Sequence, residues 1–258
     1  MTSLPAGSSE QTGNLLLSRL RPDDWGILGP HLEEWSAPSG AVLYSPGDRV
    51  GFAYFPRDQS LVSYLVLASN DQAIEAGLVG KEGAVGGIVS QGSLPAYARA
   101  VVQQGGPFLR VELSRLEEAK DRSLTIRHLF SRYADCMIAQ IFQSVACNAA
   151  HSIEQRTAKW LLAAASRTGR ANMVLTQEQL ASMLGVGRSY LSRVINALRE
   201  NDAILTHRGR ITVNDLDALK EKECKCSSMV AKHFDDVMSG LYSSQVEAAP
   251  QVGDSEYT

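Results

Sequence analysis

The sequence contains no apolar run long enough to cross a membrane, and its N-terminus lacks the basic and apolar regions of a signal peptide. Cysteine is also scarce. Four cysteines in a chain of 258 residues are too few for a disulfide framework, and none of them precedes Cys136. These absences argue against an integral membrane protein and against a disulfide-stabilised secreted domain. The sequence therefore predicts a cytoplasmic protein with reduced thiols.

A catalytic motif is also missing. Candidate acids and bases such as His31, Asp48, Glu75 and Glu82 are scattered along the chain, and no nucleophile is placed at a spacing that would group it with them. The sequence therefore predicts that the protein is not an enzyme and assigns it no catalytic residue.

The net charge of −3 gives no overall indication of nucleic-acid binding, but the charge is unevenly distributed. Residues 152–213 contain nine Arg and Lys and four Asp and Glu, which gives +5, so the rest of the chain carries −3 − 5 = −8. A basic segment in an acidic chain is expected for a confined DNA-binding face. The length and a hydrophobic content of 44% allow two domains with cores of their own.

Short β-type runs punctuated by glycine fill the region between residues 37 and 113, which predicts an antiparallel sandwich or barrel. The expected strands are Ala41–Tyr44, Phe52–Phe55, Leu61–Leu67, Ile74–Val79, Arg99–Gln103 and Phe108–Val111. The glycine-rich segment 80–87 could be taken for a phosphate-binding loop, but it matches neither nucleotide-binding glycine fingerprint. Glycines at tight β-corners are the preferred interpretation.

Residues 116–149 contain neither Gly nor Pro, which predicts one long helix. Apolar residues surround most of its circumference, so we expect it to be covered on two sides, by its own β domain and by the same helix of a second subunit. The predicted dimerisation residues are Phe130, Tyr133, Met137 and Ile141. The alternative is a single helix buried inside a monomer.

The most informative stretch is residues 176–213. Thr176 and Gln179 form a predicted capping box that starts one helix, and Gly185 ends it. A second helix is expected from Arg188 to Glu200. Its buried face would consist of Leu191, Val194, Ile195 and Leu198, and its opposite face of Ser189, Ser192, Arg193 and Asn196. A polar face of this kind on an anchored helix suits base edges in a major groove.

Two β-rich runs follow, joined by a turn at Arg208 and Gly209, which predicts a hairpin with a basic tip suited to phosphates. An ordinary helical pair with a solvated face is the alternative, but two helices followed by a basic hairpin at this spacing disfavour it. The predicted DNA-binding residues are Thr176, Gln177, Arg188, Ser189, Ser192, Arg193, Asn196, Arg208 and Arg210.

In this order, a β-roll, a long helix and a winged helix-turn-helix, the chain resembles the Crp/Fnr family of bacterial transcription regulators. The resemblance is sharp over residues 152–213, looser over 37–149 and absent at the two ends. It implies an α+β fold, with an N-terminal antiparallel β-roll like that of cyclic-nucleotide-binding domains, a long dimerisation helix and a C-terminal winged helix-turn-helix. The expected segments are a disordered or short helical lead-in over 1–20, the β-roll over 21–115, the dimerisation helix over 116–149, the DNA-binding domain over 150–223 and a C-terminal extension over 224–258. Within these, residues 1–14 and 243–258 are expected to be disordered.

The family's recognition helix typically begins with a pattern like Arg-Glu-x-x-x-Arg. Here the matching residues are Arg188, Ser189 and Arg193, so both arginines are kept while serine replaces the glutamate. Because the acidic acceptor for a cytosine amino group is lost, we expect an operator preference unlike that of the family's better-known members.

The sensing domain departs further from the family pattern. Gly86 and Gly87 stand where cyclic-nucleotide binders carry a ribose-binding carboxylate, and Arg99 is assigned to the next strand rather than to the phosphate-binding segment. The N-terminal cysteine cluster of iron–sulfur members is missing. His31, His128 and His151 remain candidate haem ligands, although a single histidine is more often structural. The effector and any cofactor are left unknown.

The pair Cys224 and Cys226 could hold one edge of a metal ion or respond to oxidants. A full zinc site needs two more ligands, and only His207 and His233 are near in sequence. Inert thiols are the preferred interpretation, so no metal site is predicted.

The sequence thus predicts a homodimeric, sequence-specific DNA-binding transcription regulator on an inverted-repeat operator, with double-stranded DNA as its partner, RNA polymerase as a candidate partner and no contact with membranes. The alternative is an effector-binding or enzymatic β-barrel protein whose helix-turn-helix mediates protein contacts.

Overall fold

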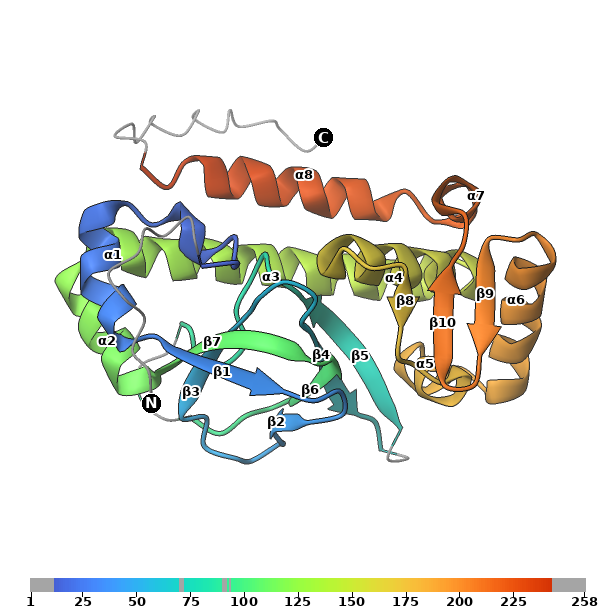
Figure 1. Cartoon of the computed structure of the whole chain (residues 1–258), viewed down its shortest axis with the longest axis horizontal. Coiled ribbons are helices and arrows are strands. Elements are labelled where there is room, and N and C mark those ends of the chain that lie inside the picture. Colours follow the sequence, from blue (N-terminus) through green and yellow to red (C-terminus); the bar gives the residue numbers. More distant parts are fainter. Residues whose placement is uncertain (1–11, 70–71, 90–91, 93, 243–258) are drawn as a thin grey trace, which may run out of the picture.

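The computed structural model describes residues 12–69, 72–89, 92 and 94–242 (Figure 1). The N-terminal part consists of two antiparallel sheets, and the C-terminal part of a helical domain with its own small sheet. This arrangement confirms the expected α+β fold with a β-roll, a long helix and a winged helix-turn-helix. The tail at 243–258 and residues 1–11 of the lead-in, which we expected to be disordered, lie outside the described residues.

One sheet of the β-roll has the strand order β1-β7-β3, and the other has the order β2-β6-β4-β5. The bounds are β1 (Glu33–Ala37), β2 (Val42–Tyr44), β3 (Phe52–Pro56), β4 (Leu61–Leu67), β5 (Ala73–Val79), β6 (Arg99–Gln104) and β7 (Gly106–Glu112). Six of these were predicted with ends that differ by two residues or less. Strand β1 was missed, because two glutamates and exposed positions interrupt the apolar pattern that marks a strand.

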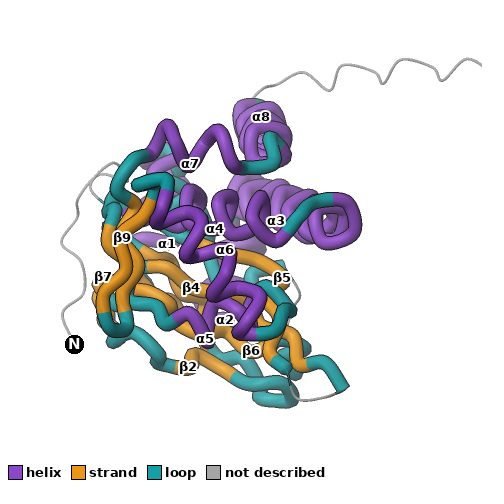
Figure 2. The backbone as a smooth tube through the Cα atoms, turned by 90° about the vertical axis from the view of Figure 1, so that its right-hand side faces the viewer, coloured by secondary structure: helices purple, strands orange, loops and turns teal. Residues whose placement is uncertain are grey.

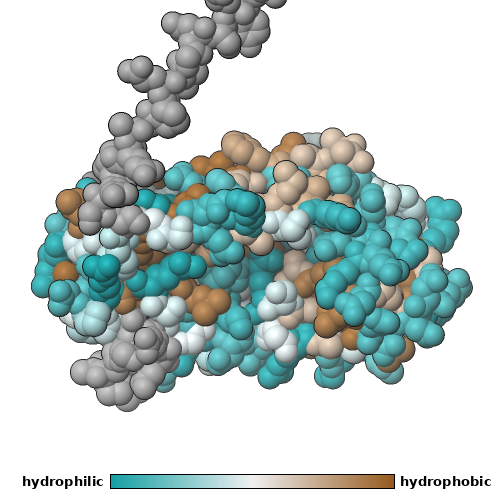
Figure 3. Space-filling view, turned by 90° about the horizontal axis from the view of Figure 1, so that it is seen from above, coloured by the Kyte–Doolittle hydropathy of each residue, from teal (hydrophilic) through white to brown (hydrophobic). Residues whose placement is uncertain are grey.

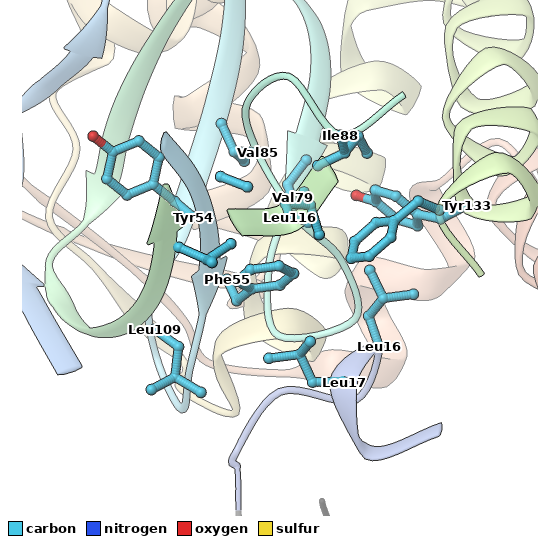
Figure 4. Close-up of a cluster of buried hydrophobic side chains, with 14 of the residues drawn as sticks. Leu16, Leu17, Tyr54, Phe55, Val79, Val85, Ile88, Leu109, Leu116 and Tyr133 are labelled. Carbon is cyan, nitrogen blue, oxygen red and sulfur yellow. The ribbon is translucent and has the colours of Figure 1, made fainter. Parts of the chain in front are cut away.

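The β-roll core lies between the two sheets and is closed by residues from outside them (Figure 4). Phe55 sits at its centre, and Tyr133 enters from the long helix. Leu16 and Leu17 come from the N-terminal segment, beside the short 3-10 helix η2 (Leu17–Arg19). Asn14 is buried, and its side-chain amide donates hydrogen bonds to the carbonyls of Pro56 and Gly83, each with a length of 2.9 Å. Residues 12–14 are therefore ordered against the roll, and the prediction of disorder was wrong for them.

The helix predicted over 116–149 is in fact two helices, α2 (Leu113–Arg122) and α3 (Leu124–Ala150). The chain breaks at Ser123, whose backbone is extended and whose hydroxyl caps α3 by accepting from the Ile126 amide. The same hydroxyl lies 2.5 Å from the Asp24 carboxylate of α1 (Pro22–Leu28), which is followed by the 3-10 helix η3 (Gly29–His31). A buried serine that accepts from its own helix and donates to a distant carboxylate favours a corner over a continuous helix.

The helical domain follows α3 and has the elements α4 (Ile153–Thr168), β8 (Asn172–Met173), α5 (Gln177–Met183), α6 (Arg188–Glu200), β9 (Ile204–His207), β10 (Arg210–Val213) and α7 (Leu216–Lys222). Its sheet has the order β8-β10-β9, and β8 was not predicted. The core of this domain also includes Leu61, Leu65 and Leu78 of the β-roll. The two parts of the chain therefore share a buried apolar contact.

The last described helix, α8 (Cys226–Ser239), lies along α3 and runs in the opposite direction (Figure 1). Arg132 of α3 donates to the Val237 carbonyl, and Met238 and Leu241 join the β-roll core. The C-terminal extension is therefore part of the folded body. Within the described residues, no helix is long and apolar enough to cross a membrane.

Candidate nucleic-acid interface

The two helices of the predicted helix-turn-helix are positioned by local interactions that the sequence encodes. Thr176 and Gln179 form the expected capping box at the start of α5. The turn after α5 depends on Gly185, which has a φ of +70°, a conformation that favours glycine. The Val186 amide then donates to the Ala181 carbonyl over 2.9 Å and closes the corner. Interactions within about ten residues of sequence therefore fix how α5 and α6 cross.

Helix α6 is anchored by the predicted apolar face. Leu191, Val194, Ile195 and Leu198 are all buried in the core of the helical domain. Burial of such side chains contributes about 1.5–3 kcal/mol each, so the helix is held firmly on one side. Its bounds, Arg188–Glu200, coincide with the predicted ones.

The opposite side of α6 is open to solvent. We call Ser189, Ser192, Arg193 and Asn196 the base-contacting face; Ser192 is half-buried and the other three are exposed. Arg188, the first residue of the helix, is also exposed. Helix α6 lies at the end of the molecule away from the β-roll, and Figure 2 views the chain from that end. No described element covers this face, so it is free to enter a groove.

The hairpin of β9 and β10 turns at Arg208 and Gly209, as predicted, and Gly209 has a φ of +71°. Arg208 and Arg210 are exposed. The Leu175 amide donates to the Gly209 carbonyl over 3.1 Å, which ties the tip of this wing to the segment just before α5. The wing therefore presents its arginines from a tip that is fixed relative to α5.

The four arginines of the interface have no acidic partner. Among the described residues, Arg188, Arg193, Arg208 and Arg210 form no salt bridge, whereas arginines such as Arg57 and Arg167 do. Their guanidinium groups keep all their donors for a ligand. Unpaired guanidinium groups on one surface attract phosphates and can donate two hydrogen bonds to a guanine.

Sequence reasoning missed one exposed residue of this surface. Tyr190 lies at the side of the base-contacting face with 45% of its surface exposed, and the Arg193 guanidinium is 5.3 Å from its ring centre. A cation–π contact of this kind holds the arginine in one direction. The sequence could have indicated this residue, because the tyrosine does not belong to the repeating apolar positions that form the buried face of the helix.

The remaining two predicted DNA-binding residues are at the start of the motif. Thr176 is exposed, but its hydroxyl is already used to cap α5, and Gln177 is half-buried as the first residue of that helix.

The predicted dimerisation residues are divided between two environments. Phe130 and Tyr133 are 1% and 2% exposed and belong to the β-roll core, so they are unavailable to a second chain. Met137 is half-buried and accepts a hydrogen bond from the Tyr133 hydroxyl over 3.2 Å. Ile141 is 40% exposed. Their nearly continuous apolar pattern concealed which of them face the chain's own sheets.

The β-roll contains a cavity of about 340 Å³ beside Gly86 and Gly87. Its polar groups include the hydroxyls of Tyr44 and Tyr64, whose pKa values are raised mainly by burial, so both phenols are neutral. The residues that line it include no arginine and no carboxylate: Tyr44, Val50, Tyr64, Gly86, Gly87, Gly92, Leu94, Pro95, Ala96, Tyr97, Ala98 and Leu113. A charged ligand would therefore find no counter-charge among the described residues that line this cavity.

Gly86 is itself required by the backbone. Its φ is +117°, and a Cβ at this position would lie 2.4 Å from the Phe52 carbonyl oxygen. A residue with a side chain is excluded there by both strain and contact. Arg99 is the first residue of β6, as expected from the sequence, and does not line the cavity.

Comparison with known families gives a match to the Crp-like helix-turn-helix domain over residues 155–222, which contain α5, α6 and the wing. The chain therefore contains a Crp-like helix-turn-helix domain. Curated protein sequences gave no significant match.

Several solved structures share the fold at low sequence identity. FixK2 from Bradyrhizobium japonicum is 15% identical, with a TM-score of 0.62 over 75% of this chain and 98% of FixK2. The c-di-GMP-responsive regulator CLP of Xanthomonas campestris is 15% identical, with a TM-score of 0.60 over 76% of this chain and 100% of CLP. A CRP-family transcriptional regulator from Thermus thermophilus, TTHB099, is 19% identical, with a TM-score of 0.60 over 74% of this chain and 95% of its own.

Proposed function

We propose that this chain is a Crp/Fnr-type transcription regulator that binds DNA as a homodimer, with α6 of each protomer in successive major grooves of an inverted repeat. The observation that carries the proposal is the solvent-facing surface of α6, where Arg188 and the base-contacting face are presented on a helix anchored by four buried apolar residues. The wing arginines, Arg208 and Arg210, are proposed to contact phosphates beside the groove.

The dimer is proposed to form along α3. Large apolar side chains on one side of this helix are exposed: Ile138 (46%), Ile141 (40%), Phe142 (70%) and Val145 (63%). Figure 3 views the molecule from above Figure 1, and apolar patches are visible among the polar side chains of that face. Ala134, Ile138, Ile141 and Val145 alternate spacings of four and three residues, the heptad spacing of a coiled-coil seam. A second copy of α3 is the occupant that this spacing fits.

The cavity of the β-roll is proposed to hold a small uncharged effector rather than a cyclic nucleotide, because its lining offers phenol hydroxyls and apolar groups. A regulator of this type acts where the chromosome is, so we propose a cytoplasmic location and RNA polymerase as a further partner. The effector and the direction of regulation are left open.

The test is selection of binding sites from a random duplex library with the purified full-length chain, followed by sedimentation of the chain with the selected duplex. We expect an enriched inverted repeat, two chains per duplex and affinity that falls steeply with salt. Equal binding to selected and scrambled duplexes, or one chain per selected duplex, would contradict the proposal.

A further inference from the structure

Three thiols from two distant parts of the sequence lie together at the junction of α3, α4 and α8. Cys147 is near the C-terminal end of α3, Cys224 precedes α8 and Cys226 is its first residue. Their three Sγ atoms lie within 4.8 Å of one another, and Cys147 and Cys224 are 3.8 Å apart. We call these three cysteines with His151 the thiol cluster, because the His151 Nε2 is 3.6 Å from the Cys226 Sγ.

Two of these separations match edges of a tetrahedral metal site, whereas the His151 ring is not in the group of mutually close ligand atoms and would have to move toward Cys147 and Cys224 on binding. With Zn–S bonds of about 2.3 Å and Zn–N bonds of about 2.0–2.1 Å, tetrahedral angles place two sulfurs about 3.8 Å apart and a sulfur and a nitrogen about 3.6 Å apart. The Cys147–Cys224 and Cys226–His151 distances take these two values. Three cysteines and one histidine are one of the ligand sets of structural zinc sites.

The surroundings of Cys147 suit a thiolate, whereas burial raises the pKa values of Cys224 and Cys226. The Lys159 Nζ lies 3.3 Å from the Cys147 Sγ, and the Gln143 amide also contacts this sulfur, over 3.7 Å. Hydrogen bonds to the ligating atoms are the outer-shell contacts that orient metal ligands. Three thiolates around a divalent cation leave one net negative charge, which the Lys159 ammonium offsets. Cys147 and Cys224 are buried and Cys226 is half-buried, so the site is sheltered but reachable.

Among the described residues, the thiol contact is the one hydrogen bond that the His151 ring makes, so no other contact fixes the ring in place. His151 ends α3, and its Nδ1 is buried without a hydrogen-bond partner in the described part of the chain. Its Nε2 faces only a thiol in the contacts of the structure. A disulfide between Cys147 and Cys224 would use two sulfurs and leave Cys226 and His151 without a role. A metal ion uses all four groups.

We propose that Cys147, Cys224, Cys226 and His151 bind a thiophilic divalent cation, Zn²⁺ above all, with the release of the thiol protons to solvent. The ion would join the start of α8 to the hinge between α3 and α4, where the β-roll part of the chain leads into the DNA-binding domain. The sequence prediction of no metal site considered His207 and His233 as further ligands. The fold instead supplies Cys147 and His151, which are about 75 residues earlier in the chain.

The test uses the reduced, metal-free full-length chain, titrated with Co²⁺ without oxygen and then with Zn²⁺. We expect one equivalent of Co²⁺ to give the visible bands of a tetrahedral site and the near-ultraviolet bands of thiolate ligation, and Zn²⁺ to abolish both. Cys147→Ser, Cys224→Ser and Cys226→Ser should each weaken Zn²⁺ binding by at least about a hundredfold, and His151→Gln by at least about tenfold. The matched control is Cys136→Ser, since Cys136 is a buried cysteine of α3 outside the cluster and its replacement should leave binding unchanged.

Because a cysteine variant can fail to fold, protection of the native chain is measured as well. Zn²⁺ should protect Cys147, Cys224 and Cys226 from alkylation and should slow hydrogen exchange in α8. The proposal is overturned if Co²⁺ gives no tetrahedral thiolate bands, if the cluster variants bind Zn²⁺ as tightly as Cys136→Ser, or if the reduced chain takes up no metal and air joins Cys147 to Cys224. None of these measurements involves DNA, so their failure would leave the proposed function untouched.

Discussion

The Trp160 indole Nε1 donates a hydrogen bond to the Glu75 carboxyl over 2.9 Å and thereby links α4 of the DNA-binding domain to β5 of the β-roll. Ser63 of β4 lies 2.5 Å from the other carboxyl oxygen. The Arg167 side chain makes a parallel link, to Glu82 over 2.7 Å and to Gln140 over 2.9 Å. The contact between the two parts of the chain is therefore polar as well as apolar, and it contains a buried acid.

Glu75 is expected to make stability depend on pH. Burial raises its pKa from 4.5 to about 7, although the Ser63 and Trp160 hydrogen bonds lower it. Because the pKa of Glu75 is raised in the folded state, the protonated carboxyl stabilises the fold fully below pH 4.5. This stabilisation is lost as the pH rises through 7. The free energy of unfolding should therefore fall by about 3 kcal/mol across this pH range. Glu75→Gln has no charge to bury, and its amide can accept from Trp160 through the oxygen and donate to the Ser63 hydroxyl through the nitrogen. The variant should therefore be more stable than the native chain at pH 8, and its stability should depend less on pH.

The measurement is the free energy of unfolding by urea between pH 5 and 8. Glu118→Gln is the matched control, because Glu118 is 57% exposed at the surface of α2 and pairs with Arg115. An unchanged pH dependence in Glu75→Gln would show that Glu75 is not the titrating group.

The seam along α3 is expected to respond to charge. Ile141→Glu and Phe142→Glu place a carboxylate in the apolar stripe, where a dimer would bury it without a partner. Both variants should sediment as monomers and lose binding to the operator. Met229→Glu is the control, since Met229 is an apolar residue of α8 that is 64% exposed and lies outside the stripe. If Ile141→Glu and Phe142→Glu remained dimers, the interface would lie on another surface.

The cavity of the β-roll is expected to reject cyclic nucleotides. Their phosphate would be buried against Tyr44 and Tyr64, and the described residues that line the cavity offer it no cation. Calorimetry with cyclic AMP or cyclic GMP at micromolar concentration should give no saturable heat. Saturable heat that disappears in Tyr64→Leu would place the nucleotide in this cavity and refute the expectation.

Local rules explain what could be predicted from the sequence. The capping box at Thr176 and the bounds of α6 depend on residues within one or two helical turns, and both are found. The failures involve residues distant in sequence. The corner at Ser123 depends on Asp24, about a hundred residues earlier, and the thiol cluster on a separation of 77 residues. Periodicity also could not show that Phe130 faces the sheets while Ile141 faces outward, because both belong to one apolar helix.

The recognition helix provides the last prediction. Arg188 begins α6, and residues at the N-terminal end of a recognition helix reach furthest into a major groove. Two hydrogen bonds from its guanidinium to one guanine would distinguish that base pair from the others. Arg188→Ala should therefore cost about 1–3 kcal/mol of binding free energy on the operator and relax the preference at one base pair in each half-site.

Arg208→Ala is the contrasting variant, because Arg208 lies at the tip of the wing and is placed to contact phosphate. It should weaken binding to operator and scrambled duplexes about equally. The slope of log affinity against log salt concentration should decrease in magnitude by about one for each phosphate that the wing no longer neutralises. Both variants are titrated against the operator and its single-base variants at several salt concentrations. If Arg188→Ala weakened binding equally for every duplex, Arg188 would be a phosphate contact, and the placement of α6 in the groove would have to be revised.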